Sequence, residues 1–397
     1  MKTKYKNCIS YIRKNQKELT FHLPKDKDIH LGLPNPFIAP SSCEGIFEND
    51  QFYWDSYFII LGLVDTNQID LAKGMVENLA YLCNRFGIIP SRNRYYNLGI
   101  SQPPFFTSMV LEVFNKTKDK KWLQDMAKIA EKELRNYWMD SKKIHNVSKG
   151  LSRYCDHWHT HLTSEHESGW DMTSRFYERC MDFLPIDLNC LLYKYEIDFS
   201  LIYKKLDNKI KSKKYSNNSK KRKEVINKLM WNQEKGFYFD YDYQNKKQSD
   251  FFSLAGFYTL WSGLATKNQA KKLKENLSIF EYNGGLANTQ KEGLSETFKQ
   301  WDYPNGWPNQ QWIVIKGLLN YGFKEEAKRL AKKWIDMNKK VYEKTGTFWE
   351  KYNVLTVDRG KDGRYPTQKE FGWTGAIFIK LISEIDKYGS FTNSRGR

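Results

Sequence analysis

The 397-residue chain lacks the patterns that mark several large classes of protein. No stretch approaches the roughly 18 uninterrupted apolar residues of a membrane-spanning helix, so we expect no contact with a membrane. The first residues, "MKTKYKNCISYIRKNQKELTFHL", contain no apolar run of signal-peptide length, which favours a cytoplasmic protein. No GxxxxGK[ST], GxGxxG or GxSxG motif occurs, so phosphate-loop and serine-hydrolase chemistries have no support.

Cysteines and linkers are also scarce. The six cysteines form no CxxC pair and no compact framework, so free thiols are expected rather than disulfides. They are Cys8, Cys43, Cys83, Cys155, Cys180 and Cys190. No Pro/Gly/Ser-rich stretch divides the chain, which predicts a single domain over residues 1–397.

Acidic residues are outnumbered, 46 against 64 Lys and Arg, which gives a formal net charge of +18. Such an excess is typical of nucleic-acid-binding proteins, but here it is mostly lysine and spread along the chain. The one dense cluster, 208–225, contains Asn and Ser and indicates a solvated loop or a frayed helix. We therefore expect no nucleic-acid partner, and binding to a polyanion remains a weaker alternative.

Helical periodicity dominates the sequence, and two kinds of helix alternate. One kind is apolar nearly all round, as expected for an interior helix. Such segments begin at residues 53, 101, 183, 251, 310 and 372. Amphipathic segments lie near 5–17, 66–86, 118–138, 200–232, 266–277 and 324–343. This alternation predicts an all-α fold, a single (α/α)6 barrel. A superhelical repeat array is the competitor, but no fixed repeat length is visible.

Aromatic residues are abundant, with 13 Trp, 25 Tyr and 24 Phe. Tryptophan stands directly before aspartate three times, at Trp54-Asp55, Trp170-Asp171 and Trp301-Asp302. Aromatic rings stack on the C–H faces of a pyranose, and carboxylates bind its hydroxyl groups. Glycoside hydrolysis needs in addition two carboxyl groups that flank the scissile bond. These pairs therefore indicate a sugar-binding cleft.

The motifs around these pairs resemble those of the trehalase family. "YWDSYF", "SQPPFF", "SGWD" followed by "SR", "QWDYPNGW", "EKYN" and "FGWTG" occur in the family's order, and the resemblance covers about residues 35–385. It implies an inverting α-glycoside hydrolase that uses no metal or organic cofactor. A related clan that cleaves glucosylglycerate, mannosylglycerate or N-glycan glucose shares the barrel and the catalytic pair.

By this resemblance, Asp171 corresponds to the general acid and Glu350 to the general base. The residues that correspond to substrate contacts are Trp54, Asp55, Gln102, Gly169 and Trp301. Asp302 either binds sugar or ties down the "YPNGW" turn. Asp171 itself has an alternative as a helix N-cap, a position that Asp favours.

Several positions depart from the family pattern. Phe47 and Ile100 stand where trehalases carry arginine, and "RGKDGRYPTQKE" replaces a glycine-rich run, with Arg364 in place of a glutamate. The family's Arg-Pro-Glu stretch ahead of "SGWD" has no counterpart. Arg364 either points into the cleft, where it would favour an anionic or at least a differently hydroxylated leaving group, or lies on a surface turn in water.

The stretch "HWHTH" places His157, His159 and His161 at alternate positions, which on a strand would point to one side. That arrangement could bind a metal ion, but no cysteine or carboxylate pattern completes the site. We predict a plain surface or cleft-rim loop there and no metal. Arg175 of "TSRF" is expected to pair with a nearby carboxylate.

The sequence thus predicts a monomeric cytoplasmic trehalase-type hydrolase acting on a small carbohydrate, with trehalose as the best substrate. Another small α-glucoside or α-mannoside, such as glucosylglycerate, is the first alternative. A catalytically inactive sugar-binding relative is the second, although both Asp171 and Glu350 are retained.

Overall fold

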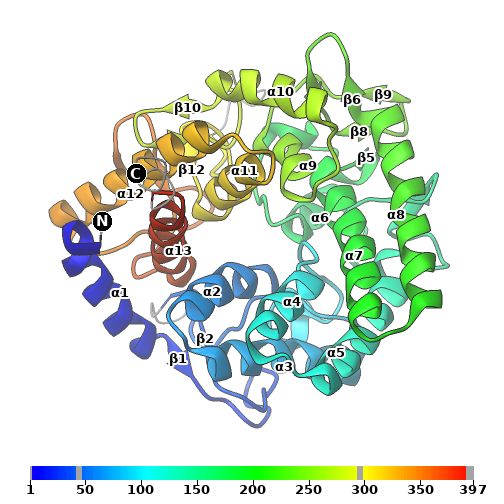
Figure 1. Ribbon diagram of the computed structural model, residues 1–397, viewed down its shortest axis with the longest axis horizontal. Helices are drawn as coiled ribbons and strands as arrows, with labels where there is room; N and C mark the ends of the chain where they lie inside the picture. The colour runs from blue at the N-terminus through cyan, green and yellow to red at the C-terminus, as the bar shows by residue number, and fades with distance from the viewer. Residues whose placement is uncertain (1, 42–46, 293–297, 390–397) are drawn as a thin grey trace, which may run out of the picture.

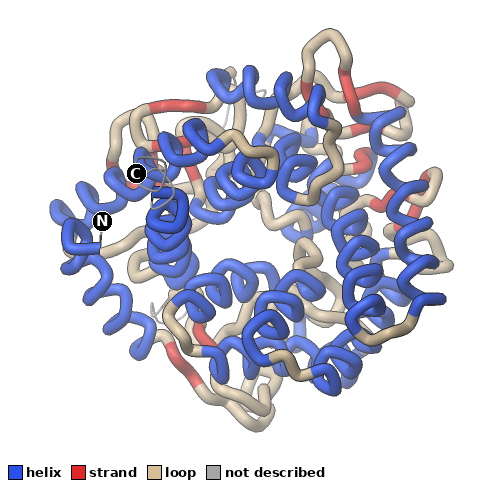
Figure 2. Tube along the Cα trace, in the orientation of Figure 1, coloured by secondary structure: helices blue, strands red, loops and turns tan. Residues whose placement is uncertain are grey.

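A computed structural model of the chain describes residues 2–41, 47–292 and 298–389. Six of its helices form an inner ring in which each packs against the next and the last returns to the first (Figures 1 and 2). They are α2 (Tyr53–Asp65), α4 (Phe106–Thr117), α7 (Ile186–Lys205), α9 (Tyr258–Trp261), α11 (Pro308–Asn320) and α13 (Gly372–Gly389). This closed ring confirms the predicted (α/α)6 barrel.

Six further helices lie outside this ring and connect its members. They are α1 (Lys6–Glu18), α3 (Ile69–Phe86), α5 (Lys120–Glu133), α8 (Lys209–Met230), α10 (Lys267–Glu275) and α12 (Lys324–Thr345). The inner helices are apolar on all sides because they are covered on all sides, and residues 53–64 of α2 are all buried. The outer helices bury one stripe and expose charged residues on the other.

Two segments differ from what their sequences indicated. The segment from residue 251 gives only a 3₁₀ turn (Leu254–Phe257) followed by the short α9. Gly256 packs so tightly there that a Cβ would lie 2.6 Å from the Phe237 ring, and Gly263, at φ +77°, follows the helix end. The segment 208–225, for which the sequence indicated a solvated loop or a frayed helix, belongs to α8, which runs unbroken from an N-cap in which the Asn208 side chain accepts from the Lys211 amide. The helical alternative is therefore right and the loop alternative wrong.

Short antiparallel strands join the helices at the ends of the barrel, and none is longer than three residues in the described ranges. They are β1 (Thr20–Phe21), β2 (Phe37–Ile38), β3 (Asn146–Ser148), β4 (Leu151–Ser152), β5 (Phe183–Leu184), β6 (Trp231–Asn232), β7 (Phe237–Tyr238), β8 (Tyr241–Asp242), β9 (Lys247–Gln248), β10 (Glu281–Tyr282), β11 (Gly285–Leu286), β12 (Asn305–Gly306), β13 (Tyr352–Asn353) and β14 (Asp358–Arg359). The sheet β12-β13-β14 joins the "QWDYPNGW" loop to the segment after Glu350.

The sequence led us to expect free cysteines and no membrane-spanning helix, and the described residues bear on both points. The five cysteines among them are buried and free, and Cys43 lies outside the described ranges. No helix in these ranges combines the length and the apolar character that crossing a membrane requires.

Candidate active site

A cavity of about 780 Å³ lies at the end of the barrel where the inner helices begin. Its walls come from the loops and first turns that open α2, α4, α7, α11 and α13, which are far apart in the chain. The volume matches that of a pocket for a small ligand. Of the predicted site residues, Trp54, Asp55, Gln102, Gly169, Asp171, Trp301, Glu350 and Arg364 all line it.

Four tryptophans form one continuous aromatic wall of the cavity. The rings of Trp301 and Trp307 are parallel, with centroids 3.9 Å apart. The ring centroids of Trp54 and Trp301 are 5.6 Å apart. The Trp373 centroid lies 5.8 Å from that of Trp54 and 5.9 Å from that of Trp307. All four side chains are nearly fully buried, so this wall is rigid and lies deep in the cavity.

Asp171 has surroundings that favour its protonated form. Its carboxyl group is enclosed by protein and opens mainly to the cavity, with 24% of the side chain exposed. Burial raises the pKa of Asp171 to about 7, against the opposing effect of the Arg364 charge, and the negative charge of Glu350 adds to the rise. The Gln300 side chain donates to the Asp171 carbonyl and fixes the backbone at this point. A carboxyl group with this pKa exchanges protons near neutral pH.

Glu350 lies in the same cavity with two hydrogen-bond donors. The buried Lys351 ammonium donates to Oε2 at 2.8 Å, and the Tyr365 hydroxyl donates to Oε1 at 2.7 Å. Burial and the Glu350 charge raise the pKa of Tyr365 well above its usual value, so this phenol keeps its proton. Each carboxyl oxygen of Glu350 thus accepts one hydrogen bond from the protein.

Asp55, on the first turn of α2, is the third carboxyl group of the cavity. Burial raises its pKa well above the usual range, and the charges of Glu350 and then Asp171 add to the effect. The three carboxyl groups therefore interact electrostatically across one space. Gln102 lies beside them and accepts from the Trp54 amide at 3.2 Å.

Gly169 of "SGWD" is explained by close packing. Its φ of +72° falls in the left-handed region, and a Cβ built there would lie 2.6 Å from the Trp54 ring. Only glycine satisfies both conditions, which brings the backbone before Asp171 directly against the aromatic wall.

Asp302 and Arg175 hold the loop that carries Asp171. The Asp302 carboxylate accepts from the Thr173 hydroxyl at 2.7 Å and the Ser174 amide at 3.0 Å, and it is not among the described residues that line the cavity. Of the two alternatives for Asp302, sugar binding or fixing a turn, these contacts favour a structural role. The segment that Asp302 holds is the "TSR" stretch, however, and not the "YPNGW" turn. Arg175 is fully buried and binds both Asp187 and Asp240, which confirms the predicted pairing.

Arg364 lies at the cavity and not on a turn that faces only water. Its Nη1 is 2.7 Å from Nε2 of His166 and 3.3 Å from Oδ2 of Asp171, while half of the side chain is exposed. Sequence reasoning did not find His166, because it becomes significant only when folding brings residue 364 to α6 (His161–Glu167).

The "HWHTH" stretch is a turn followed by the start of α6, not a strand. Its histidines diverge: His157 stacks on Trp158, the Nδ1 of His159 lies 3.4 Å from the Cys155 thiol, and His161 accepts from the Met181 amide. No group of three or more metal-ligating side chains occurs in the described part of the chain. Trp158 and Thr160 line the cavity, so the prediction of a cleft-rim loop is confirmed.

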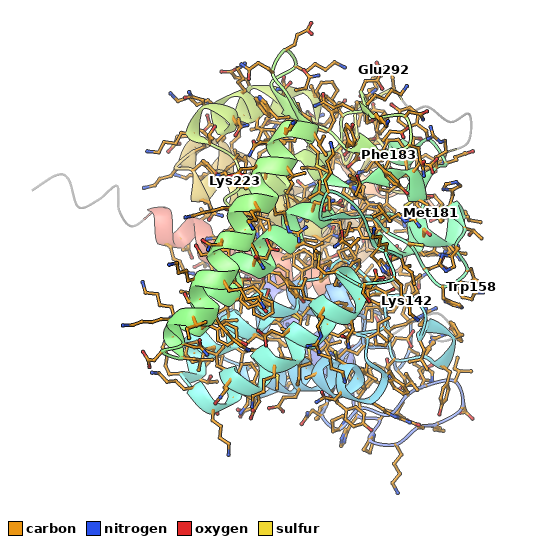
Figure 3. All side chains as sticks on the ribbon, turned by 90° about the vertical axis from the view of Figure 1, so that its right-hand side faces the viewer. Lys142, Trp158, Met181, Phe183, Lys223 and Glu292 are labelled. Atoms are coloured by element: carbon orange, nitrogen blue, oxygen red, sulfur yellow. The ribbon has the colours of Figure 1, made fainter. Side chains whose placement is uncertain are left out.

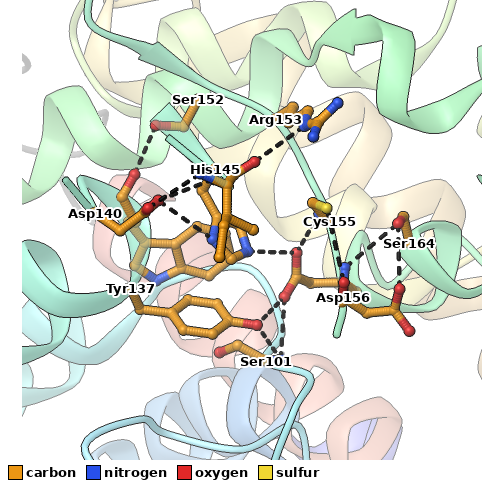
Figure 4. Close-up of polar contacts among 12 residues, drawn as sticks. Ser101, Tyr137, Asp140, His145, Ser152, Arg153, Cys155, Asp156 and Ser164 are labelled. Atoms are coloured by element: carbon orange, nitrogen blue, oxygen red, sulfur yellow. Dashed lines mark hydrogen bonds and ion pairs between the residues drawn. The ribbon is translucent and has the colours of Figure 1, made fainter. Parts of the chain in front are cut away.

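A largely buried network of polar contacts includes Ser101, His145 and Cys155 (Figure 4). Glu167 accepts from the Tyr137 hydroxyl, the Ser101 amide at 3.2 Å and the Cys155 amide at 2.7 Å. His145 contacts the same carboxylate at 3.2 Å. Burial opposes the charge of His145, but the carboxylates of Glu167 and Asp140 raise its pKa to about 9. The network connects the "SQPP" loop to the "SGWD" loop, since Ser101 donates to Glu167. No spacing of residues in the sequence indicated these contacts.

Comparisons with known proteins agree with this geometry. The model of the family described as Trehalase matches residues 3–165 and 155–386. The cytosolic neutral trehalase of Beauveria bassiana is 34% identical over 89% of this chain and 59% of its own length. The periplasmic trehalase of Shigella flexneri is 31% identical over 90% of this chain and 70% of its own length. The chain thus spans less than two thirds of the fungal relatives that it matches.

Solved structures give the same result for the fold. The neutral trehalase Nth1 from Saccharomyces cerevisiae superposes with a TM-score of 0.79 at 30% identity, over 95% of this chain and 79% of that one. The mannosylglycerate hydrolase from Thermus thermophilus reaches 0.72 at 18% identity, over 94% of this chain and 100% of that one, which is a likeness of fold. On the family match, which covers nearly its whole length, the chain belongs to the trehalase family.

Proposed function

We propose that this chain hydrolyses an α-glycosidic bond with inversion, with Asp171 as the general acid and Glu350 as the general base. The observation that carries the proposal is the contrast between two carboxyl groups in one tryptophan-walled cavity. Burial raises the pKa of Asp171 to about 7, so it carries a proton to give near neutral pH, whereas both oxygens of Glu350 accept hydrogen bonds, from Lys351 and Tyr365. Inverting glycoside hydrolysis requires one group of each kind.

Each group has a defined task in this mechanism. Asp171 donates its proton to the glycosidic oxygen as the bond to the anomeric carbon breaks, and the leaving group departs as an alcohol. Glu350 takes a proton from a water molecule that attacks the opposite face of the sugar. The tryptophan wall excludes other water, and Trp54 and Asp55 are expected to hold the ring and hydroxyl groups of the sugar that is released.

Trehalose is the proposed substrate, because the relatives with about 30% identity or more are named trehalases. The alternative is another small α-glucoside or α-mannoside. It is favoured by one observation: Arg364 enters the cavity at a position where the family pattern has glutamate.

Further parts of the proposal concern the state of the protein. We propose one catalytic domain over residues 1–397, working as a monomer without metal or organic cofactor. The contacts that α13 makes with both α1 and α2 support a single unit, since they join the two ends of the described chain. A cytoplasmic location is proposed by analogy with the cytosolic relatives, although a periplasmic relative shows that location varies. Light scattering, which measures mass in solution, tests the monomer.

The pH dependence of hydrolysis tests the role of Asp171. The general acid has to be protonated, and its pKa is raised to about 7, so kcat/KM should be retained below this pH. Above it, kcat/KM should fall by about tenfold per pH unit as the proton is lost. Initial rates on trehalose in a series of buffers at constant ionic strength measure this limb. A profile that is flat from pH 6 to pH 9 would rule out Asp171 as the acid.

A further inference from the structure

The cavity changes in character between its floor and its mouth. At the floor, Trp54, Asp55 and Glu350 are at most 4% exposed. At the mouth, Trp158 is 52% exposed and lies at the periphery of the molecule in Figure 3. Arg364 lies at this outer end too, because about half of its side chain is exposed. In the proposed mechanism the floor receives the sugar, so the mouth receives the leaving group.

Three arginines line the cavity besides its three carboxyl groups. Two of them, Arg92 and Arg94, bind the same buried carboxylate, Asp50, at 3.1 and 2.7 Å. Arg364 pairs with Asp171, and the pairing weakens whenever Asp171 holds the proton that it donates in catalysis. In that state the guanidinium of Arg364 keeps His166 as its neighbour and has donors available for an anion.

The pKa of His166 indicates the sign of the electrostatic potential around Arg364. Burial lowers its pKa to about 4, and the positive charges of Arg364 and Arg92 contribute to this lowering. The imidazole is therefore neutral at physiological pH, and its Nε2 lies 2.7 Å from Nη1 of Arg364. A positive potential strong enough to oppose an imidazolium attracts an anionic group of a ligand.

The position of Arg364 also limits where that group lies. Nη1 is 3.3 Å from Oδ2 of Asp171, and a general acid approaches the atom that it protonates within about 3 Å. A group bound on the side of Arg364 that faces Asp171 can therefore lie within about two or three bonds of the glycosidic oxygen. A carboxylate on the carbon that carries this oxygen meets the condition, and a guanidinium binds carboxylate in a bidentate manner.

We propose that the mouth, through Arg364, selects glycosides whose leaving group carries a carboxylate next to the glycosidic bond. Arg364 is thus a specificity-determining residue that distinguishes an anionic from a neutral leaving group. This inference rests on the proposed hydrolytic function and names its preferred class of substrate. Trehalose, which is neutral, uses the same floor but leaves Arg364 without an anionic partner.

The test compares substrates that differ in one group. α-Glucosylglycerol and α-glucosylglycerate differ only by a hydroxymethyl group in place of the carboxylate, and α-glucosylglycerol phosphate carries its charge further from the glycosidic oxygen. For each, kcat/KM is measured with the native chain, Arg364→Gln and Arg359→Gln. Arg359 is the control, because it ends strand β14 shortly before Arg364, is paired with Asp362 and does not line the cavity.

The native chain should prefer glucosylglycerate over glucosylglycerol by about tenfold or more, the range of a hydrogen bond to a charged group. Arg364→Gln should remove most of this ratio, and Arg359→Gln should keep it. Taking the ratio within each variant cancels any effect of Arg364 on the protonation of Asp171.

Two results overturn the inference outright. One is equal kcat/KM on glucosylglycerol and glucosylglycerate with the native chain, and the other is a ratio of these two values that Arg364→Gln leaves unchanged. A preference for the phosphate compound over the carboxylate contradicts the placement next to the glycosidic bond. In each of these cases, hydrolysis of trehalose or glucosylglycerol leaves the proposed function intact. If no glycoside is hydrolysed, the proposed function and the inference fail together.

Discussion

Asp171→Asn is expected to lower kcat on trehalose by about 10²- to 10⁴-fold, the usual contribution of a general acid. The amide keeps the volume of the side chain but has no proton of suitable acidity to give to the glycosidic oxygen. Glu350→Gln should cause a loss of similar size, because an amide takes no proton from water. Initial rates by a coupled glucose assay measure both effects.

Glu178→Gln is the matched control for these variants. Its carboxylate follows Asp171 closely in the chain but is exposed and pairs with Lys299 at 3.2 Å. We expect unchanged kcat for this variant and thermal transitions close to that of the native chain for all three. An Asp171→Asn protein that folds normally and keeps more than about a tenth of the native kcat would be incompatible with the assigned role.

Arg175→Met is expected to destabilise the protein by about 3–5 kcal/mol, the cost of removing one partner from a buried ion pair. Arg175 is inaccessible to solvent and binds Asp187 and Asp240 through four contacts of 2.6–2.7 Å. Without the guanidinium, two buried carboxylates face each other with no compensating cation. Urea unfolding, followed by tryptophan fluorescence, measures the change in the free energy of unfolding.

Arg179→Gln provides the comparison, because Arg179 also pairs with two aspartates but is 38% exposed. Its loss should cost at most about 1 kcal/mol. If Arg175→Met does not fold, the triple variant Arg175→Met, Asp187→Asn, Asp240→Asn should recover soluble protein, since it removes the uncompensated charges. Similar destabilisation by the two arginine substitutions would show that burial of the Arg175 cluster is not the source of its effect.

The barrel could be predicted from the sequence, because each helix shows by its own apolar pattern whether it belongs to the inner or the outer ring. An inner helix such as α2 has to be apolar on all sides, and an outer helix such as α3 on one side, so the alternation is visible without any contact. The main error is at α9, which is closely followed by Gly263 in the left-handed region, a conformation that ends a helix. Apolar composition alone does not reveal that effect.

The site residues that belong to short motifs could be predicted from the sequence. Those that come together only in the folded chain could not. Asp171, Glu350 and the tryptophans occur in short, recognisable stretches that open inner helices. Arg92, His166 and Tyr365 became visible only when the mouth was formed from three separate loops. The contacts that tie the Asp302 carboxylate to the 173–174 loop join residues 128 and 129 positions apart, so no local pattern could decide its role.

The most direct test of the central claim is the anomeric form of the first-formed products, observed by proton NMR during hydrolysis of α,α-trehalose. Inversion at Asp171 and Glu350 releases one glucose in the β form and the other in the α form, in equal amounts before mutarotation. We predict this equal mixture in the first minutes with the native chain and no detectable products over the same time with Asp171→Asn. Release of α-glucose alone, which retention produces, would contradict the account.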